Sequence, residues 1–175
     1  NHVDNELRFE VLERGLTLQG SARRLQVRLF FAPGRNAPAL DLLIYAPVGA
    51  NRRNPCPMFL GLNFMGNHTV TTDPMVDVTK SWVRNRTEIG YQNNQASAAA
   101  RGVSAERWPI QLLIESGFGI ATAYYGDIDP DFDDGFMNGV HALYPKGDDS
   151  NGQHWGSIAT WSWGLSRILD YLQTI

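Results

Sequence analysis

The sequence has few of the features that mark disulfide-rich, membrane-spanning or nucleic-acid-binding proteins. Its single cysteine, Cys56, cannot form an internal disulfide, and it lies between two prolines without a pattern of metal ligands around it. No apolar run approaches the roughly 18 residues that a transmembrane helix requires. Acidic residues outnumber basic ones, 18 to 15, which leaves no basic surface for nucleic acid or an anionic membrane. We therefore expect neither a nucleic-acid nor a membrane partner.

Familiar signatures of hydrolytic and metal sites are also missing. No Gly-x-Ser-x-Gly motif occurs, and Ser166 falls inside the last predicted helix instead of on the strand-to-helix elbow that exposes a nucleophile. The four histidines lack the spacing of a zinc site. The aspartates between 127 and 134 do not fit a calcium-binding loop, and we expect them to cap backbone N–H groups or to pair with arginine. The sequence thus predicts no metal site and no cofactor.

The composition is that of one globular domain. The chain has 175 residues, of which 43% are hydrophobic and 11% are aromatic. This length suits a single domain, and this hydrophobic share excludes disordered and collagen-like proteins. The aromatic residues suit either a sugar-binding surface or a large core, and we expect most of them in the core.

Four segments have the apolar patterns of β-strands, and they lie at 24–32, 39–46, 58–64 and 118–125. The first two resemble a half-buried antiparallel pair at the outer part of a sheet. The run at 58–64 is nearly continuously apolar, which is typical of a central parallel strand buried on both faces, and 118–125 reads as the next buried strand.

Two helices are predicted among these strands. The first follows Ser104, has Pro109 in its first turn and ends at Gly117. The second is strongly amphipathic and covers 157–172. Strand and helix alternation after an antiparallel start predicts an α/β fold with a mixed sheet.

The order of elements ends at an unusual point for such a fold. A helix that follows a parallel strand returns the chain to another strand, yet the sequence stops at Thr174 and Ile175, where that crossover ends. Long polar loops at 65–104 and 126–153 separate the elements, and loops of this length are usually functional or disordered. We therefore expect an incomplete fold with functional loops.

Two polar segments follow the third and fourth predicted strands, at 63–69 and 124–127. Ligands in open α/β sheets bind beyond the carboxyl ends of the strands. Gly66 lets a ligand approach backbone N–H groups there, beside amide and imidazole side chains, so the first segment suits an oxyanion site or a pocket wall. The alternative is a tight turn in which these side chains only satisfy backbone groups.

Four motifs resemble the bacterial branch of the glucuronoyl esterases, carbohydrate esterase family 15. They are GLNFMGNHT at 61–69, RWP at 107–109, YYGDIDPD at 124–131 and WSWGLSR at 161–167. The resemblance implies a three-layer α/β-hydrolase sandwich that cleaves the ester between glucuronic acid on xylan and lignin alcohols. It further implies a Ser–His–acid triad, no metal, and a secreted or periplasmic location.

The family's nucleophile elbow, Gly-x-Ser-Arg-x-Gly-Lys, has no counterpart in this chain, and neither do its acid and base. Residues 1–175 are therefore expected to be the N-terminal part of one α/β-hydrolase catalytic domain, inactive alone and dependent on its own C-terminal half. No catalytic residue is assigned. By resemblance, the wall of the substrate cleft is formed by Asn63, Gly66, Asn67, His68, Tyr125 and Asp127.

Two other functions remain open on the sequence. One keeps the fold and changes the substrate to an acetyl or other simple sugar ester. The other is a non-catalytic carbohydrate-binding domain that uses Trp82, Tyr91 and Tyr144 as stacking platforms.

Overall fold

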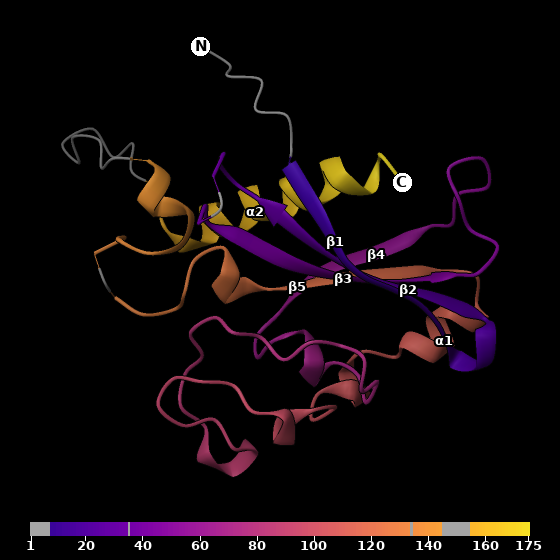
Figure 1. Cartoon of the computed structure of the whole chain (residues 1–175), viewed down its shortest axis with the longest axis horizontal. Helices are drawn as coiled ribbons and strands as arrows, with labels where there is room; N and C mark the ends of the chain where they lie inside the picture. The colour runs from indigo at the N-terminus through magenta and orange to yellow at the C-terminus, as the bar shows by residue number, and fades with distance from the viewer. Residues whose placement is uncertain (1–7, 35, 134, 145–154) are drawn as a thin grey trace.

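The computed structural model describes residues 8–34, 36–133, 135–144 and 155–175. Within them, the strands are β1 (Arg8–Thr17), β2 (Ala22–Phe30), β3 (Ala39–Pro47), β4 (Met58–Asn63) and β5 (Gly119–Tyr124). They form one sheet in the order β1-β2-β3-β5-β4 (Figure 1). Successive pairs from β1 to β5 are antiparallel, whereas β4 runs parallel to β5. The predicted mixed sheet is confirmed.

Strand β1 has no counterpart among the predicted strands. None of its residues is buried, Phe9 and Leu16 are exposed, and its register with β2 shifts between Val11 and Glu13. An outer strand that buries few side chains lacks the regular apolar alternation by which strands are detected. Periodicity therefore finds β2 and β3 as an antiparallel pair but misses β1. Their predicted outer position is wrong for β3, which is the middle strand of the described sheet.

The buried strand of the sheet is β5, and β4 lies outside it. All six residues of β5 are buried, between β3 on one side and β4 on the other. The parallel direction predicted for β4 is confirmed, but its predicted central position is wrong for the described residues, because β4 is the last strand in the order. Accordingly, 53% of Phe59 is exposed.

The two helices differ in how well their bounds agree with the prediction. Helix α2 (Ser157–Leu172) lies where periodicity places it. Helix α1 (Ile110–Glu115) is shorter than predicted, because Pro109 is its N-cap and the preceding residues form a separate 3-10 turn. Gly117 has a φ of +82°, which suits the residue that ends a helix. No helix in the described ranges is long and apolar enough to cross a membrane.

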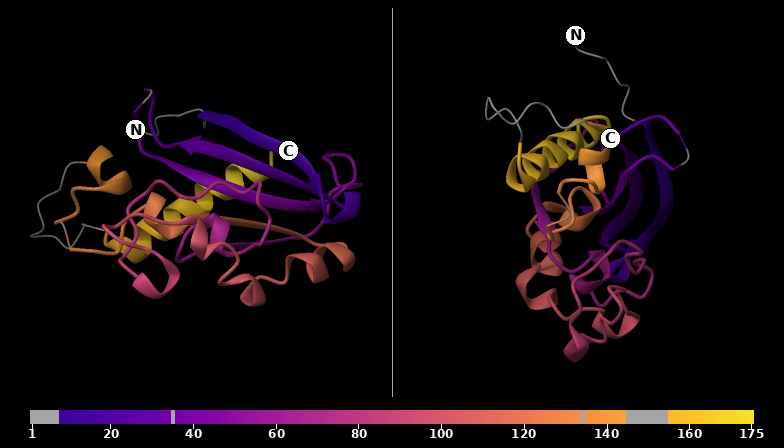
Figure 2. Two further views of the ribbon diagram at one scale, coloured as in Figure 1. Left: turned by 60° about the horizontal axis from the view of Figure 1, so that its bottom comes forward. Right: turned by 90° about the vertical axis from the view of Figure 1, so that its left-hand side faces the viewer.

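The sheet is covered on both faces. Alternate residues of β3 point to opposite sides: Leu42 packs towards α2, and Leu43 packs towards α1. Figures 1 and 2 show α2 on one side, and α1 with the long segment 65–104 on the other. Helix α2 contributes Thr160, Gly164, Ile168 and Tyr171 as its buried residues.

Truncating α2 on its buried face should destabilise the protein. Ile168 is fully buried in the cluster between the sheet and α2, so Ile168→Ala removes apolar contacts and leaves a cavity. We expect the free energy of unfolding to fall by about 2–5 kcal/mol. The matched control is Ile158→Ala in the same helix, where the side chain is exposed. Denaturant unfolding of both variants in the complete gene product tests this, and equal losses would contradict the assigned packing.

Candidate functional site at the carboxyl edge of the sheet

The parallel pairing of β4 and β5 brings the six predicted cleft residues to one edge. Asn63, the last residue of β4, lies opposite Tyr124, the last residue of β5. A 3-10 turn, η2 (Asn67–Thr69), follows β4, and a second one, η6 (Tyr125–Asp127), follows β5. The structure therefore places the six residues at the end of β4 and in the two turns that follow β4 and β5.

Asn63 holds the turn after β4 in one conformation. Its side chain is buried, and its Nδ2 donates to Asn67 Oδ1 at 2.7 Å and to Thr122 Oγ1 at 3.1 Å. Its Oδ1 accepts the Gly66 N–H at 2.8 Å. Because that N–H is already used inside the turn, the tight-turn interpretation holds for this group rather than an oxyanion site.

Gly66 is required by this turn, and Asn67 connects the turn to β3. Gly66 has a φ of +101°, and a Cβ there would lie 2.7 Å from Thr79 Cγ2. Asn67 donates from Nδ2 to the Asp41 carbonyl at 2.8 Å. The turn is therefore fixed both by its own backbone and by a strand that is distant in sequence.

His68 lies inside the molecule beneath this turn. Its side chain has no exposed surface. Tyr91 donates its hydroxyl to the Met65 carbonyl at 2.6 Å, and its oxygen lies 2.9 Å from His68 Nε2. Burial, together with the charge of Arg101, lowers the pKa of His68 to about 4. His68 is thus neutral at physiological pH and supports the turn from within.

Asp127 joins three parts of the chain at the end of β5. Its Oδ1 accepts from Ser81 Oγ at 2.5 Å, and its Oδ2 accepts from the Asp41 N–H at 3.0 Å. Burial raises the pKa of Asp127 to about 7, although the two hydrogen bonds act in the opposite direction. The expectation that this aspartate-rich loop caps backbone groups or pairs with arginine is confirmed here and in the contact of Asp131 with Arg84 at 3.7 Å.

Tyr125 is the base of an aromatic stack. Its ring centroid lies 5.2 Å from that of Trp161 and 5.1 Å from that of Tyr124. On its outer side is Phe64, at 5.4 Å. Phe64 is not among the site residues predicted from the sequence, where its signal is an aromatic residue directly after an apolar strand.

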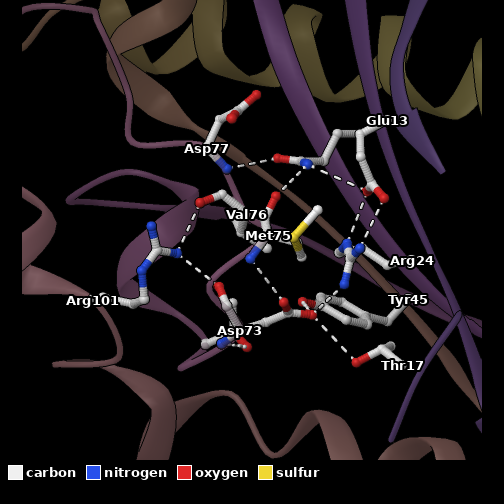
Figure 3. Close-up of polar contacts among 11 residues, drawn as sticks. Glu13, Thr17, Arg24, Tyr45, Asp73, Met75, Val76, Asp77 and Arg101 are labelled. Atoms are coloured by element: carbon white, nitrogen blue, oxygen red, sulfur yellow. Dashed lines mark hydrogen bonds and ion pairs between the residues drawn. The ribbon is translucent and has the colours of Figure 1, made fainter. Parts of the chain in front are cut away.

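The long segment 65–104 is held on the sheet by a buried charged network that the sequence did not reveal (Figure 3). Arg24 on β2 donates Nε and Nη2 to the Glu13 carboxylate, both at 2.8 Å, and donates Nη1 to Asp73 Oδ2 at 2.6 Å. Arg101 donates to the carbonyls of Asp73 and Val76 at 2.7 and 2.8 Å. The segment is thus packed against β2 through polar contacts.

Gln26, which lies two residues after Arg24 on β2, extends the same network. Its Nε2 donates to the Met75 carbonyl and its Oε1 accepts the Asp77 N–H, both at 2.9 Å. The Gln26 amide thus satisfies one carbonyl and one N–H of the segment backbone, which a neighbouring strand would otherwise satisfy.

One buried group has the composition of a hydrolase triad but not its geometry. His141 Nε2 lies 2.9 Å from Thr160 Oγ1 and 3.6 Å from Asp129 Oδ2. A triad places the hydroxyl and the carboxylate on different ring nitrogens, whereas here both contacts involve Nε2. We therefore assign this group no catalytic role.

The stacking platforms predicted for a carbohydrate-binding domain are not equally accessible. Tyr91 is only 1% exposed, so its assignment is wrong. The ring of Trp82 packs on Phe132 at 4.6 Å. Tyr144 is 42% exposed and packs on Trp155 at 5.6 Å. In the part of the chain that the structure describes, no three His, Cys, Asp or Glu side chains are placed to hold a metal ion.

Removing Arg24 should destabilise the protein and change its acid sensitivity. Arg24→Ala leaves Glu13 and Asp73 largely buried without their partner, which should cost about 3–5 kcal/mol of unfolding free energy. Arg24 lowers the pKa of Glu13; for Asp73, burial raises the pKa, but the Met75 N–H and Arg24 prevail and lower it. The wild-type protein therefore loses stability as the pH falls below about 4, and the variant should lose less.

The matched control is Arg28→Ala. Arg28 forms an ion pair with Asp41 at 2.7 Å that is more than one third exposed on both sides. Its loss should cost no more than about 1 kcal/mol. Denaturant unfolding of the complete gene product at several pH values measures both variants, and a loss for Arg24→Ala no greater than this control would contradict the anchoring role.

Asp127 should make stability fall as the pH rises towards neutrality. Its pKa is about 7 in the folded state against 3.8 for the ordinary group, so the folded chain keeps a proton that the unfolded chain releases. Asp127→Asn is neutral at every pH and should remove this part of the slope between about pH 4 and pH 7. Asp133→Asn, at an exposed position of the same loop, should leave the slope unchanged. A wild-type slope retained in Asp127→Asn would refute the assignment.

Comparison with known proteins identifies the chain's relatives. It is 46% identical over 174 residues to carbohydrate esterase MZ0003 from an unknown prokaryotic organism, which covers 98% of this chain and 39% of the relative. No family model matches the sequence.

Two solved structures are similar as well. A promiscuous CE15 esterase from a marine bacterial metagenome is 44% identical, with a TM-score of 0.81 over 97% of this chain and 42% of that one. A glucuronoyl esterase from Solibacter usitatus is 36% identical, with a TM-score of 0.83 over 98% of this chain and 43% of that one. The chain thus spans about two fifths of the length of these relatives. Over almost all of its own length, the chain is a homologue of the carbohydrate esterase family 15 proteins, as its motifs predicted.

Proposed function

We propose that this chain is the N-terminal part of a serine carboxylic-ester hydrolase that cleaves glucuronate esters joining xylan to lignin. The observation that carries the proposal is the 36–46% identity, across almost the whole chain, to proteins named carbohydrate esterase and glucuronoyl esterase. In the reaction that the resemblance implies, a serine oxygen attacks the ester carbonyl while a histidine, oriented by an acid, takes the serine proton. The histidine gives that proton to the alcohol as the ester C–O bond breaks, and water then hydrolyses the acyl-serine bond to release the sugar acid.

In this proposal the chain supplies the wall of the cleft and no catalytic group. His68 has no exposed surface, and the hydrogen bonds of Asn63 and Asn67 are used within the fold. Their role is to hold the two turns at the carboxyl edge of β4 and β5, where a nucleophile on a neighbouring strand would lie. The triad is assigned to the remaining part of the polypeptide.

An uncovered surface supports a fold that continues beyond these elements. An apolar groove of about 800 Å³ lies between the sheet and the end of α2, and its apolar lining includes Leu25, Ile44, Met58, Leu60, Leu169 and Leu172. On the neighbouring strand edge, Phe59 of β4 is half exposed. Exposed apolar surface of this size favours association with another part of the protein. We propose that the enzyme's C-terminal half covers it and completes one α/β-hydrolase domain.

The substrate class also suggests where the protein acts. Glucuronoxylan and lignin are polymers outside the cell, so we propose a secreted or periplasmic enzyme. An acetyl or other simple sugar ester is the second candidate substrate, because one of the similar structures is described as a promiscuous esterase.

Hydrolysis assays on the complete gene product and on residues 1–175 test the proposal. We expect the complete enzyme to cleave methyl and benzyl esters of glucuronic acid, and the 175-residue chain to cleave neither, since it lacks the nucleophile elbow. Reading about twenty codons further identifies that elbow, and serine-to-alanine substitution there should abolish activity.

Three outcomes would count against the proposal. A downstream sequence without a serine elbow, or a complete product inactive on every ester, would overturn it. Faster release of acetate from acetylated xylose than of methanol from methyl glucuronate would favour the second substrate. Cooperative unfolding of the isolated chain as a monomer would contradict its dependence on a C-terminal half.

A further inference from the structure

Asp41 on β3 binds a side chain from each of the two turns at the carboxyl edge. It lies one residue beyond the pair Leu42 and Ala123, where the ladder between β3 and β5 begins. Its N–H donates to Asp127 Oδ2 at 3.0 Å, and its carbonyl accepts from Asn67 Nδ2 at 2.8 Å. The N–H and the carbonyl of one residue in an antiparallel strand point to the same side. The Asn67 amide and the Asp127 carboxylate therefore lie next to each other.

A small cavity adjoins these two side chains. Its volume is about 20 Å³, and its walls include Asn67, Asp127 and, from the long segment 65–104, Val78 and Thr79. One water molecule needs a cavity of about 10–15 Å³ with two to four polar partners. The cavity is therefore large enough for one water molecule and too small for a sugar or another organic ligand.

The Asn67 amide has a donor to offer to this cavity. Asn67 is buried, and its Oδ1 accepts from Asn63 Nδ2 at 2.7 Å. A side-chain amide nitrogen carries two N–H groups. Among the described residues, Asn67 Nδ2 donates to the Asp41 carbonyl alone. The second N–H therefore needs an acceptor, because a buried donor that is left without one costs free energy.

The Asp127 carboxylate can accept further hydrogen bonds. An ionised carboxylate accepts at about four lone-pair sites, and Ser81 Oγ and the Asp41 N–H use two of them. Burial disfavours the charged form and raises the pKa of Asp127 to about 7. Another donor in the cavity stabilises the charged form, because hydrogen bonds to a carboxylate favour its ionisation.

We propose that the cavity binds one water molecule, which accepts from the Asn67 amide and donates to the Asp127 carboxylate. The Thr79 hydroxyl lines the same cavity and is available as a third partner. The water joins the turn after β4 to the turn after β5, so the two turns are tied to each other as well as to β3. This inference concerns how the edge is held together and does not depend on the esterase reaction.

The chemistry of the walls fits water better than a cation. The second N–H of Asn67 needs an acceptor, which a water oxygen supplies and a cation does not. Within the ranges that the structure describes, no three His, Cys, Asp or Glu side chains are positioned to hold a metal ion.

A high-resolution crystal structure of the complete gene product tests the site directly. We expect one water molecule at about 2.7–3.2 Å from both Asn67 Nδ2 and a carboxylate oxygen of Asp127. This measurement needs no substitution, so it decides the inference even if a variant fails to fold.

Val78→Leu tests what the water does. It adds one methylene group at the cavity wall and should displace the water. The pKa of Asp127, followed by carbon NMR of its carboxyl group, should then rise by about one unit above the wild-type value, because the carboxylate loses a donor. The other polar groups around Asp127 are the same in both proteins, and they are Ser81, Asp41, Arg28 and Asp77.

Val103→Leu is the matched control. It makes the same change in the same segment, at a position that is 47% exposed. The pKa of Asp127 should be unchanged in this variant.

The outcomes separate this inference from the proposed function. A wild-type structure without this water, or with a cation at the shorter distances of a metal ligand, overturns the inference. A pKa of Asp127 that is unchanged in Val78→Leu with its cavity filled overturns the bridge to Asp127. None of these measurements uses an ester, so the proposed function can fail while this inference stands, and the reverse.

Discussion

The parallel pairing of β4 with β5 is the constraint on which the carboxyl edge depends. It sets Asn63 opposite Tyr124, so the turns that follow the two strands begin side by side. Strand β3 runs antiparallel to β5 and therefore begins at the same edge, where Asp41 accepts from Asn67 through its carbonyl and donates to Asp127 through its N–H. One pairing thus brings three segments of the chain to a single place.

Buried polar groups then hold the long segment 65–104 in position, although apart from short 3-10 turns it contains no α-helix or named strand. Arg24 reaches Asp73 across 49 residues, and Asp127 reaches Ser81 across 46. An unpaired buried donor or acceptor costs about 1–3 kcal/mol, so each contact favours one arrangement of the segment over its alternatives. This polar anchoring explains how a segment with little periodicity forms a layer over one face of the sheet.

The uncovered apolar surfaces have different geometry. The groove beside α2 is broad, lined by strands and a helix, and suited to packing against more protein. Phe64 is a single ring on a fixed turn at the edge where α/β folds bind ligands. The groove is therefore an extended packing surface, whereas Phe64 is a single exposed ring.

Much of the fold and the location of the site follow from the sequence alone. Helix α2 and strands β3 and β5 lie close to the positions that their apolar patterns predict, and short motifs predict the similarity to carbohydrate esterase family 15 proteins. Apolar periodicity and turn residues act over a few neighbouring positions, so they can be read locally.

The tertiary structure alone decides which polar residues are buried and what they contact. It places His68 beneath the turn, uses the Gly66 N–H on Asn63, and makes Arg24 an internal anchor. Most of these partners are separated by many residues, and their pairing depends on how the strands are ordered in the sheet. Local pattern therefore determines the elements and the edge where they meet, whereas long-range hydrogen bonding and burial determine what each side chain does there.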